Sequence, residues 1–220
     1  MTAVRPERVW AVAFFAATAA VAVDTPIAAG IDFNGAIRER ATYQSAIDFD
    51  EDVPDTGWFW AQRIRLTADV GNETGVSGRL SLLSALQWGL DESPVQENRL
   101  AVQEGYIDIA SDTLRLRTGR QEVSLGSQRL VGTRDGTNVR RNWEGFRATG
   151  SFTDWTVEAI YLNLVGVEPS GAFNDRRLDE RLLSGIYFTR SGDWSNFDLY
   201  YLYSDVEEKL TIAGPGSQRR

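Results

Sequence analysis

The chain has 220 residues, of which 42% are hydrophobic and 25% are charged, and this balance excludes a polar disordered chain. Its formal net charge of -8 speaks against a general nucleic-acid binder, because neutralising phosphates requires a surplus of basic residues. The sequence contains neither Cys nor His, which excludes disulfides, thiol nucleophiles, zinc sites built from Cys or His, and His-based acid–base catalysis.

The N-terminus has the pattern of a secretory signal peptide. Arg5 and Arg8 precede an almost entirely apolar run, and small residues close it at Ala20-Val21-Ala22. The run is shorter than the roughly 20 residues that a membrane-spanning helix needs, although an uncleaved anchor is the alternative interpretation. Residues 1–22 are therefore predicted to be a signal peptide, which sends the rest of the chain out of the cytoplasm.

From Gly30 onward the hydrophobic pattern has a period of two, which indicates β-strands. In residues 57–70, Trp58 and Leu66 fall on one face while Arg63 and Arg65 fall on the other. This stretch is longer than the usual strand of about five or six residues in a soluble protein, and it suits a tilted strand that crosses a membrane. The same alternation predicts nine strands, at residues 30–43, 57–70, 75–89, 100–110, 113–123, 143–152, 155–164, 182–190 and 197–203.

The connections between these segments alternate in length. Short turns rich in Gly, Asp, Asn and Ser are expected at residues 71–75, 111–112, 151–154 and 191–193, and longer polar connections at 44–56, 91–99, 124–142 and 168–181. Aromatic residues near the strand ends suit the two girdles of a membrane barrel: Trp58, Trp60, Trp88, Trp143, Trp155, Trp194, Tyr200, Tyr201 and Tyr203. The predicted fold is an all-β, antiparallel transmembrane β-barrel over residues 23–220, incomplete at roughly nine strands.

Nearly all of the positive charge is arginine, since Lys209 is the single lysine. If the apolar strand faces meet lipid, seven arginines are predicted to point into the lumen: Arg38, Arg40, Arg63, Arg65, Arg79, Arg115 and Arg117. Guanidinium groups that line a narrow aqueous pore favour anions and can hold carboxylates through paired hydrogen bonds. The alternative is that each arginine pairs with a nearby acid, such as Asp69, Glu104 or Asp108, and only stabilises the wall.

Residues 118–149 carry several short elements in a fixed order. These elements are Gly119-Arg120-Gln121-Glu122, then Gly126-Ser127-Gln128-Arg129-Leu130 and, after a polar loop, Trp143-Glu144-Gly145-Phe146-Arg147; Gln103-Glu104-Gly105-Tyr106-Ile107-Asp108 precedes them. In order and spacing they resemble the alginate-export family of outer-membrane barrels.

The resemblance implies a monomeric outer-membrane channel of about eighteen antiparallel strands. It implies an arginine-rich constriction through which an anionic uronic-acid polymer passes outward, with membrane lipid around the wall. For Arg120, Arg129 and Arg147, the motif arginines, pinning an inward loop is the expected role, while Arg140 and Arg141 are expected to be solvated. The family's chain is about twice this length, and residues 214–220 lack a strand with a terminal aromatic, so a truncated product or a partial sequence is expected.

Several functions remain open on the sequence alone. They are an export channel for an anionic polysaccharide, a general or nutrient porin for small anionic solutes, and a non-functional truncated fragment. A soluble secreted β-protein is disfavoured by the long apolar faces, and a phospholipase barrel would lack the His that activates its nucleophile. No catalytic constellation, metal pattern or cofactor site stands out. The acidic run at residues 48–55 offers oxygen ligands for Ca²⁺, but such a run is more typical of a solvated loop.

Overall fold

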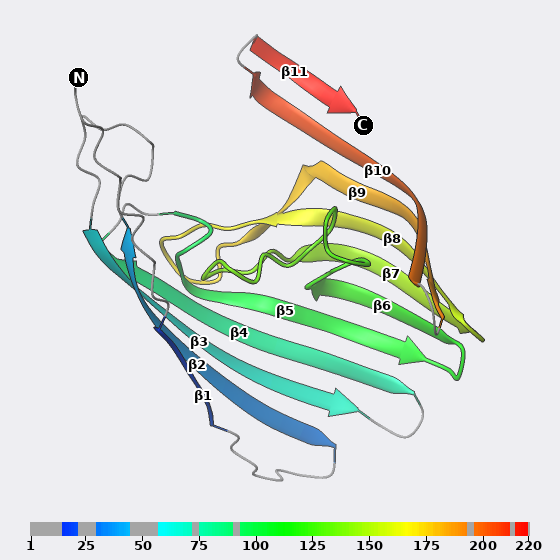
Figure 1. Cartoon of the computed structure of the whole chain (residues 1–220), viewed down its shortest axis with the longest axis horizontal. Coiled ribbons are helices and arrows are strands. Elements are labelled where there is room, and N and C mark those ends of the chain that lie inside the picture. The colour runs from blue at the N-terminus through cyan, green and yellow to red at the C-terminus, as the bar shows by residue number, and fades with distance from the viewer. Residues whose placement is uncertain are drawn as a thin grey trace, which may run out of the picture.

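A computed structural model of the chain describes residues 15–21, 30–44, 57–71, 75–89, 93–192, 196–211 and 214–219. These residues form an 11-stranded antiparallel sheet in which each strand pairs with its neighbours in the chain (Figure 1). The strands are β1 (Phe15–Val21), β2 (Ile31–Gln44), β3 (Gly57–Gly71), β4 (Val76–Trp88), β5 (Asn98–Ala110), β6 (Leu114–Gln121), β7 (Trp143–Phe152), β8 (Trp155–Gly166), β9 (Arg176–Ser191), β10 (Asn196–Thr211) and β11 (Gly214–Arg219).

The sheet curls into a trough, and β1 and β11 are its two open edges within the described residues (Figure 1). In the same residues, no helix is long and apolar enough to cross a membrane. The predicted all-β fold with an incompletely closed barrel is thereby confirmed. The nine predicted strands correspond to β2 through β10.

Two strands lie outside the sequence prediction. β1 pairs Phe15–Val21 with β2, although these residues belong to the predicted signal peptide; residues 1–14 lie outside the described residues. β11 is formed by Gly214–Arg219, and it ends without an aromatic residue. The signal peptide itself stays a prediction.

The prediction was wrong about where β9 begins. Residues 176–181 were assigned to a loop, but β9 starts at Arg176, and its first residues pair with the end of β8 beyond an irregularity between Asn163 and Val165. Apart from Leu178, these first residues are charged on both faces of the strand, so the alternation that marks a strand is absent from their sequence. β10 likewise runs to Thr211, well beyond its predicted end.

The sheet has an outer face of exposed apolar side chains and an inner face that is largely polar. Exposed residues of the outer face include Ile37, Leu66, Leu80, Ile107, Ile109, Leu116, Phe146, Tyr161 and Leu199. Trp58, Trp60, Trp88 and Trp155 are also exposed, as the predicted girdles require. Trp143 is an exception: it is only 9% exposed and belongs to a buried cluster, so its assignment to a girdle was wrong. Trp194 lies outside the described residues.

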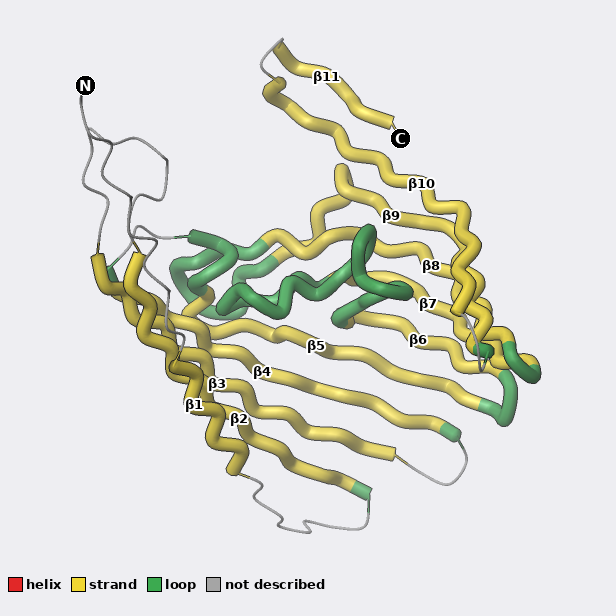
Figure 2. Tube along the Cα trace, viewed as in Figure 1, coloured by secondary structure: helices red, strands yellow, loops and turns green. Residues whose placement is uncertain are grey.

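From β2 to β10, short turns join the strands at one end of the sheet and longer connections join them at the other. The longest described connection, residues 122–142 between β6 and β7, folds back into the hollow of the trough (Figure 2). We call this segment the inner loop.

Candidate functional site

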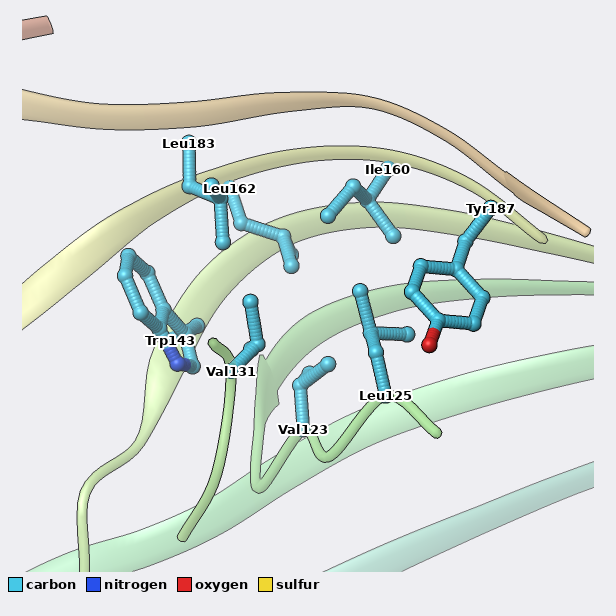
Figure 3. Packing of buried hydrophobic residues seen from close by; sticks show 8 residues of the cluster. All are labelled: Val123, Leu125, Val131, Trp143, Ile160, Leu162, Leu183 and Tyr187. Atoms are coloured by element: carbon cyan, nitrogen blue, oxygen red, sulfur yellow. The ribbon is translucent and has the colours of Figure 1, made fainter. Parts of the chain in front are cut away.

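The first half of the inner loop is attached to the wall by hydrophobic packing. Its apolar residues Val123, Leu125 and Val131 are buried. They contact inward-facing residues of β7, β8 and β9, namely Trp143, Ile160, Leu162, Leu183 and Tyr187 (Figure 3). Burying a side chain of this size contributes roughly 1.5–3 kcal/mol relative to leaving it exposed. This half of the loop is therefore part of the protein's core.

Gly126 is a point where the inner loop lies tightly against the wall. Its φ is 50°, so the backbone lies in the left-handed region that glycine tolerates best. A Cβ at this position would collide with the hydroxyl group of Tyr187. The glycine of the Gly-x-Gln-Arg-Leu element is thus explained by packing.

The second half of the inner loop is attached by hydrogen bonds to the opposite part of the trough. The fully buried Asn138 donates through Nδ2 to the main-chain carbonyls of Gln62 at 2.8 Å, Gln96 at 2.9 Å and Leu86 at 3.2 Å. Val139 packs beside it against inward-facing residues of β4. Consequently the loop spans the hollow and contacts both sides of the wall.

Glu122 lies where the inner loop leaves β6, and two arginines share its carboxylate. Arg65 of β3 and Arg140 of the loop each reach it at 2.6 Å, through different carboxylate oxygens. Gln103 donates to Glu122 Oε1 at 3.1 Å and to the main-chain carbonyl of Arg140 at 3.0 Å. Charge-assisted bonds of this kind are roughly twice as strong as neutral ones, so Glu122 joins the wall to both ends of the loop.

Arg38 and Arg40 also hold the inner loop. Arg38 Nη2 donates to the carbonyl of Thr137 at 2.9 Å and to Asn138 Oδ1 at 3.2 Å, and Arg40 Nη1 donates to the carbonyl of Gly136 at 2.8 Å. None of these acceptors carries a net charge. The two arginines therefore anchor the loop while keeping their positive charges uncompensated by these bonds.

Arg63 is surrounded by other arginines. It lies directly opposite Arg38 in the register of β2 and β3, and it also interacts electrostatically with Arg65 and Arg140. Its Nη1 is buried and has no hydrogen-bond partner among the described residues. Like charges directly opposite each other in a sheet are destabilising, so this arrangement costs stability and creates a region of positive potential.

A second group of predicted lumen arginines is neutralised by acids of the same wall. Arg79 pairs with Asp69 at 2.6 Å and with Glu104 at 3.6 Å. Arg117 forms two bonds of 2.7 Å to the two carboxylate oxygens of Asp108. At these two positions the structure therefore shows arginine–acid pairs within the wall, which is one of the two alternatives that the sequence left open.

Two further inward-facing arginines, Arg115 and Arg147, lie near the short-turn end. Arg147 pairs with Glu158 of the neighbouring strand. Arg115 is exposed, and within the described part of the chain it makes no hydrogen bond or ion pair. Of the expected lumen arginines, Arg38, Arg40 and Arg65 thus contact the inner loop and Arg63 lies beside them, whereas Arg79 and Arg117 pair with acids of the wall and Arg115 does neither.

The other motif residues have mainly structural positions. Arg120 bonds Glu144 and the main-chain carbonyls of Val102 and Asp175, all outside the inner loop. Arg129 is exposed on the inner loop next to Gln128, which has a φ of 62°. Gln121 is fully buried at the end of β6.

Gly119 and Gly145 face each other across β6 and β7, and both have positive φ. A Cβ on Gly119 would collide with the carbonyl oxygen of Gly105, and a Cβ on Gly145 with that of Tyr161. The two motif glycines therefore allow neighbouring strands to approach closely just below the inner loop.

The inner loop's own charged residues are less solvated than expected. Arg140 pairs with both Glu122 and Asp135, so its expected solvation was wrong. Arg140 donates a hydrogen bond that lowers the pKa of Asp135. Arg141 is only partly exposed, and burial lowers its pKa.

Three residues that organise the site were missed by the sequence reasoning: Gln103, Glu122 as an acceptor for arginine, and Asn138. Glu122 was noticed only as part of a motif, and nothing in the local pattern singles out an Asn within a polar loop. Among the described residues, no group of three or more acidic, His or Cys side chains is placed to hold a metal ion. The acidic run at 48–55 lies outside the described residues.

A family model described as alginate export matches residues 16–220. No curated protein and no solved structure matches the chain.

Proposed function

We propose that this chain, which belongs to the alginate export family of outer-membrane transport proteins, forms the wall of a channel. Through this channel an anionic, alginate-like polysaccharide would leave the cell. The outer face, with its exposed apolar side chains and aromatic girdles, would contact lipid. The inner face and the inner loop would line the path of the polymer. The proposal includes a cleaved signal peptide over residues 1–22 and a monomeric barrel.

The observation that carries this proposal is the excess of positive charge around the inner loop. Five guanidinium groups gather there, from Arg38, Arg40, Arg63, Arg65 and Arg140. The carboxylates paired with them are those of Glu122 and Asp135. A charge excess in a water-filled, protein-walled space attracts anions strongly, because low-dielectric walls screen it poorly.

The partial neutralisation of these arginines is compatible with transport. A channel must bind its cargo well enough to admit it, yet weakly and at several positions so that it can move on. The unpaired donor of Arg63 is buried, and Arg65 and Arg140 already share Glu122. A passing carboxylate would therefore exchange with an existing partner rather than bind to a fully free cluster.

Channel recordings test this function. The detergent-refolded protein, inserted in a planar bilayer, should be anion-selective by its reversal potential in a salt gradient, and an oligouronate should block its current. Arg63→Gln should lower both the selectivity and the block. The matched control is Arg190→Gln, because Arg190 is an exposed arginine that pairs across strands with Phe197 on the outer face.

Each outcome separates the candidate functions. Anion selectivity without block by oligouronate would favour a porin for small anionic solutes. A cation-selective pore that ignores uronate would refute the assignment to anionic cargo. Equal effects of Arg63→Gln and Arg190→Gln would show that the charge excess at the inner loop does not determine selectivity.

A further inference from the structure

A second polar site lies on the inner face, away from the inner loop. It is an open pocket of about 340 Å³ at the short-turn end of β5 to β8. This volume lies near the lower limit of about 300–1,000 Å³ for small-molecule pockets, so the pocket suits one small ligand rather than a long segment of polymer. Its lining includes Arg115, Arg117, Arg147, Thr149, Ser151 and Glu158.

Two of the three arginines in this pocket are already engaged. Both carboxylate oxygens of Asp108 bind Arg117, whose guanidinium also lies 3.7 Å from the ring centroid of Tyr106. Glu158 binds Arg147 through Nη2, but Arg147 Nε is buried without a partner among the described residues. The acids therefore fix two guanidinium groups without satisfying every donor.

The strand register explains why Arg115 differs. Its direct neighbours across the sheet are Ala110 on β5 and Thr149 on β7, and neither carries a charge. The acid in the same row, Glu158, lies one strand further away, opposite Thr149, and it pairs with Arg147. Asp112 of the adjoining turn also lines the pocket, but it forms no ion pair with Arg115, so Arg115 has no acidic partner among the described residues.

We propose that this pocket binds a single carboxylated sugar residue, with Arg115 holding the carboxylate. A guanidinium fork matches the two oxygens of a carboxylate, and the exposed Arg115 can present this fork to a ligand. The hydroxyl groups of Thr149 and Ser151 and the carboxylate of Glu158 can pair with sugar hydroxyls. The identification of the ligand as a uronate rests on the proposed function.

The position of the pocket gives the site a role. Barrels of the outer membrane have their short turns on the periplasmic side. The pocket would then meet a polymer that arrives from the periplasm before the inner loop does. It would hold the leading uronate residue and align the chain with the lumen.

Binding can be measured without any channel activity. Isothermal titration calorimetry of the detergent-solubilised protein with a diuronate should give a Kd that rises at least tenfold in Arg115→Gln. Thr149→Val should raise the Kd less, since it removes one neutral hydrogen bond. Arg190→Gln is the matched control, as it lies at the same end of the strands but on the outer face, and it should leave the Kd unchanged. The β-sheet signal in circular dichroism shows that each variant is folded.

Several results would overturn the site. They are an unchanged Kd in Arg115→Gln, an equal loss in Arg190→Gln, or equally tight binding of a neutral disaccharide. Inorganic phosphate that binds as tightly as diuronate would show a general anion site and would also reject the sugar assignment.

Two results distinguish failure of the pocket from failure of the proposed function. Diuronate binding that depends on Arg115, in a pore that is not anion-selective, would support the pocket and refute the channel function. Uronate block of the current that persists in Arg115→Gln, with an unchanged Kd for diuronate, would support the channel function and refute the pocket.

Discussion

Glu122→Gln is the substitution that best tests how the inner loop is held. The carboxylate is largely buried and receives bonds of 2.6 Å from Arg65 and from Arg140. A hydrogen bond to a charged group contributes about 1.5–3 kcal/mol, and the amide keeps only one acceptor oxygen and no charge. It would present its NH₂ group to one of the two guanidinium groups. We therefore expect docking of the loop to weaken by about 3 kcal/mol.

Hydrogen exchange measures this loss locally. The amides of Val139 and Arg141 donate to main-chain carbonyls of Val95 at 3.0 Å and of Thr133 at 2.8 Å, so their exchange reports opening of the loop. A change of about 3 kcal/mol corresponds to exchange that is about a hundredfold faster. Amides within β3 and β4 should keep their protection, because their ladder does not depend on Glu122.

Asp135→Asn is the matched control, since it removes the other acid that pairs with Arg140. Asp135 is exposed, and an exposed ion pair contributes about 0–1 kcal/mol. Exchange at Val139 and Arg141 should therefore change by less than about fivefold. The reasoning fails if Glu122→Gln changes exchange no more than Asp135→Asn does.

Two further predictions concern the loop and the N-terminus. Asn138→Leu keeps a similar side-chain volume but leaves the carbonyls of Gln62, Leu86 and Gln96 without their donor. Hydrogen exchange in the inner loop should therefore accelerate by roughly thirtyfold. Unchanged protection of the loop amides would contradict the role of Asn138. The protein isolated from the outer membrane should begin at Val23 by N-terminal sequencing; a chain that still contains Phe15–Val21 would refute cleavage and retain β1.

The wall of the trough was predictable because its signal is local. In residues 57–70, apolar and polar side chains alternate with a period of two, which predicts the face of the strand on which each one lies. The structure of β3 follows this pattern, with Trp58 and Leu66 exposed and Arg63 and Arg65 inward. The prediction failed where this signal is absent, at the polar start of β9. It also failed at Trp143, since an aromatic residue at a strand end can equally well turn inward onto the loop.

The inner loop was beyond prediction in detail because its contacts join distant parts of the chain. Arg38 reaches Thr137 across 99 positions, and Arg65 reaches Glu122 across 57. Periodicity and turn chemistry carry no information about such pairs. The resemblance implied an inward loop, but it assigned the pinning role to Arg120, Arg129 and Arg147, none of which bonds the loop from the wall among the described contacts.

The contacts of the inner loop suggest why arginine, rather than lysine, is used almost throughout. Arg38 donates from one Nη2 to both Thr137 and Asn138, a geometry that a planar, multi-donor group supplies while its charge remains. An ammonium group is more strongly hydrated and would lose more on entering the same partly buried position. Using neutral carbonyls as acceptors then has a consequence for function: the residues that fix the loop also keep the positive potential beside it. In the proposed channel, the same side chains would therefore both narrow the path and attract an anion.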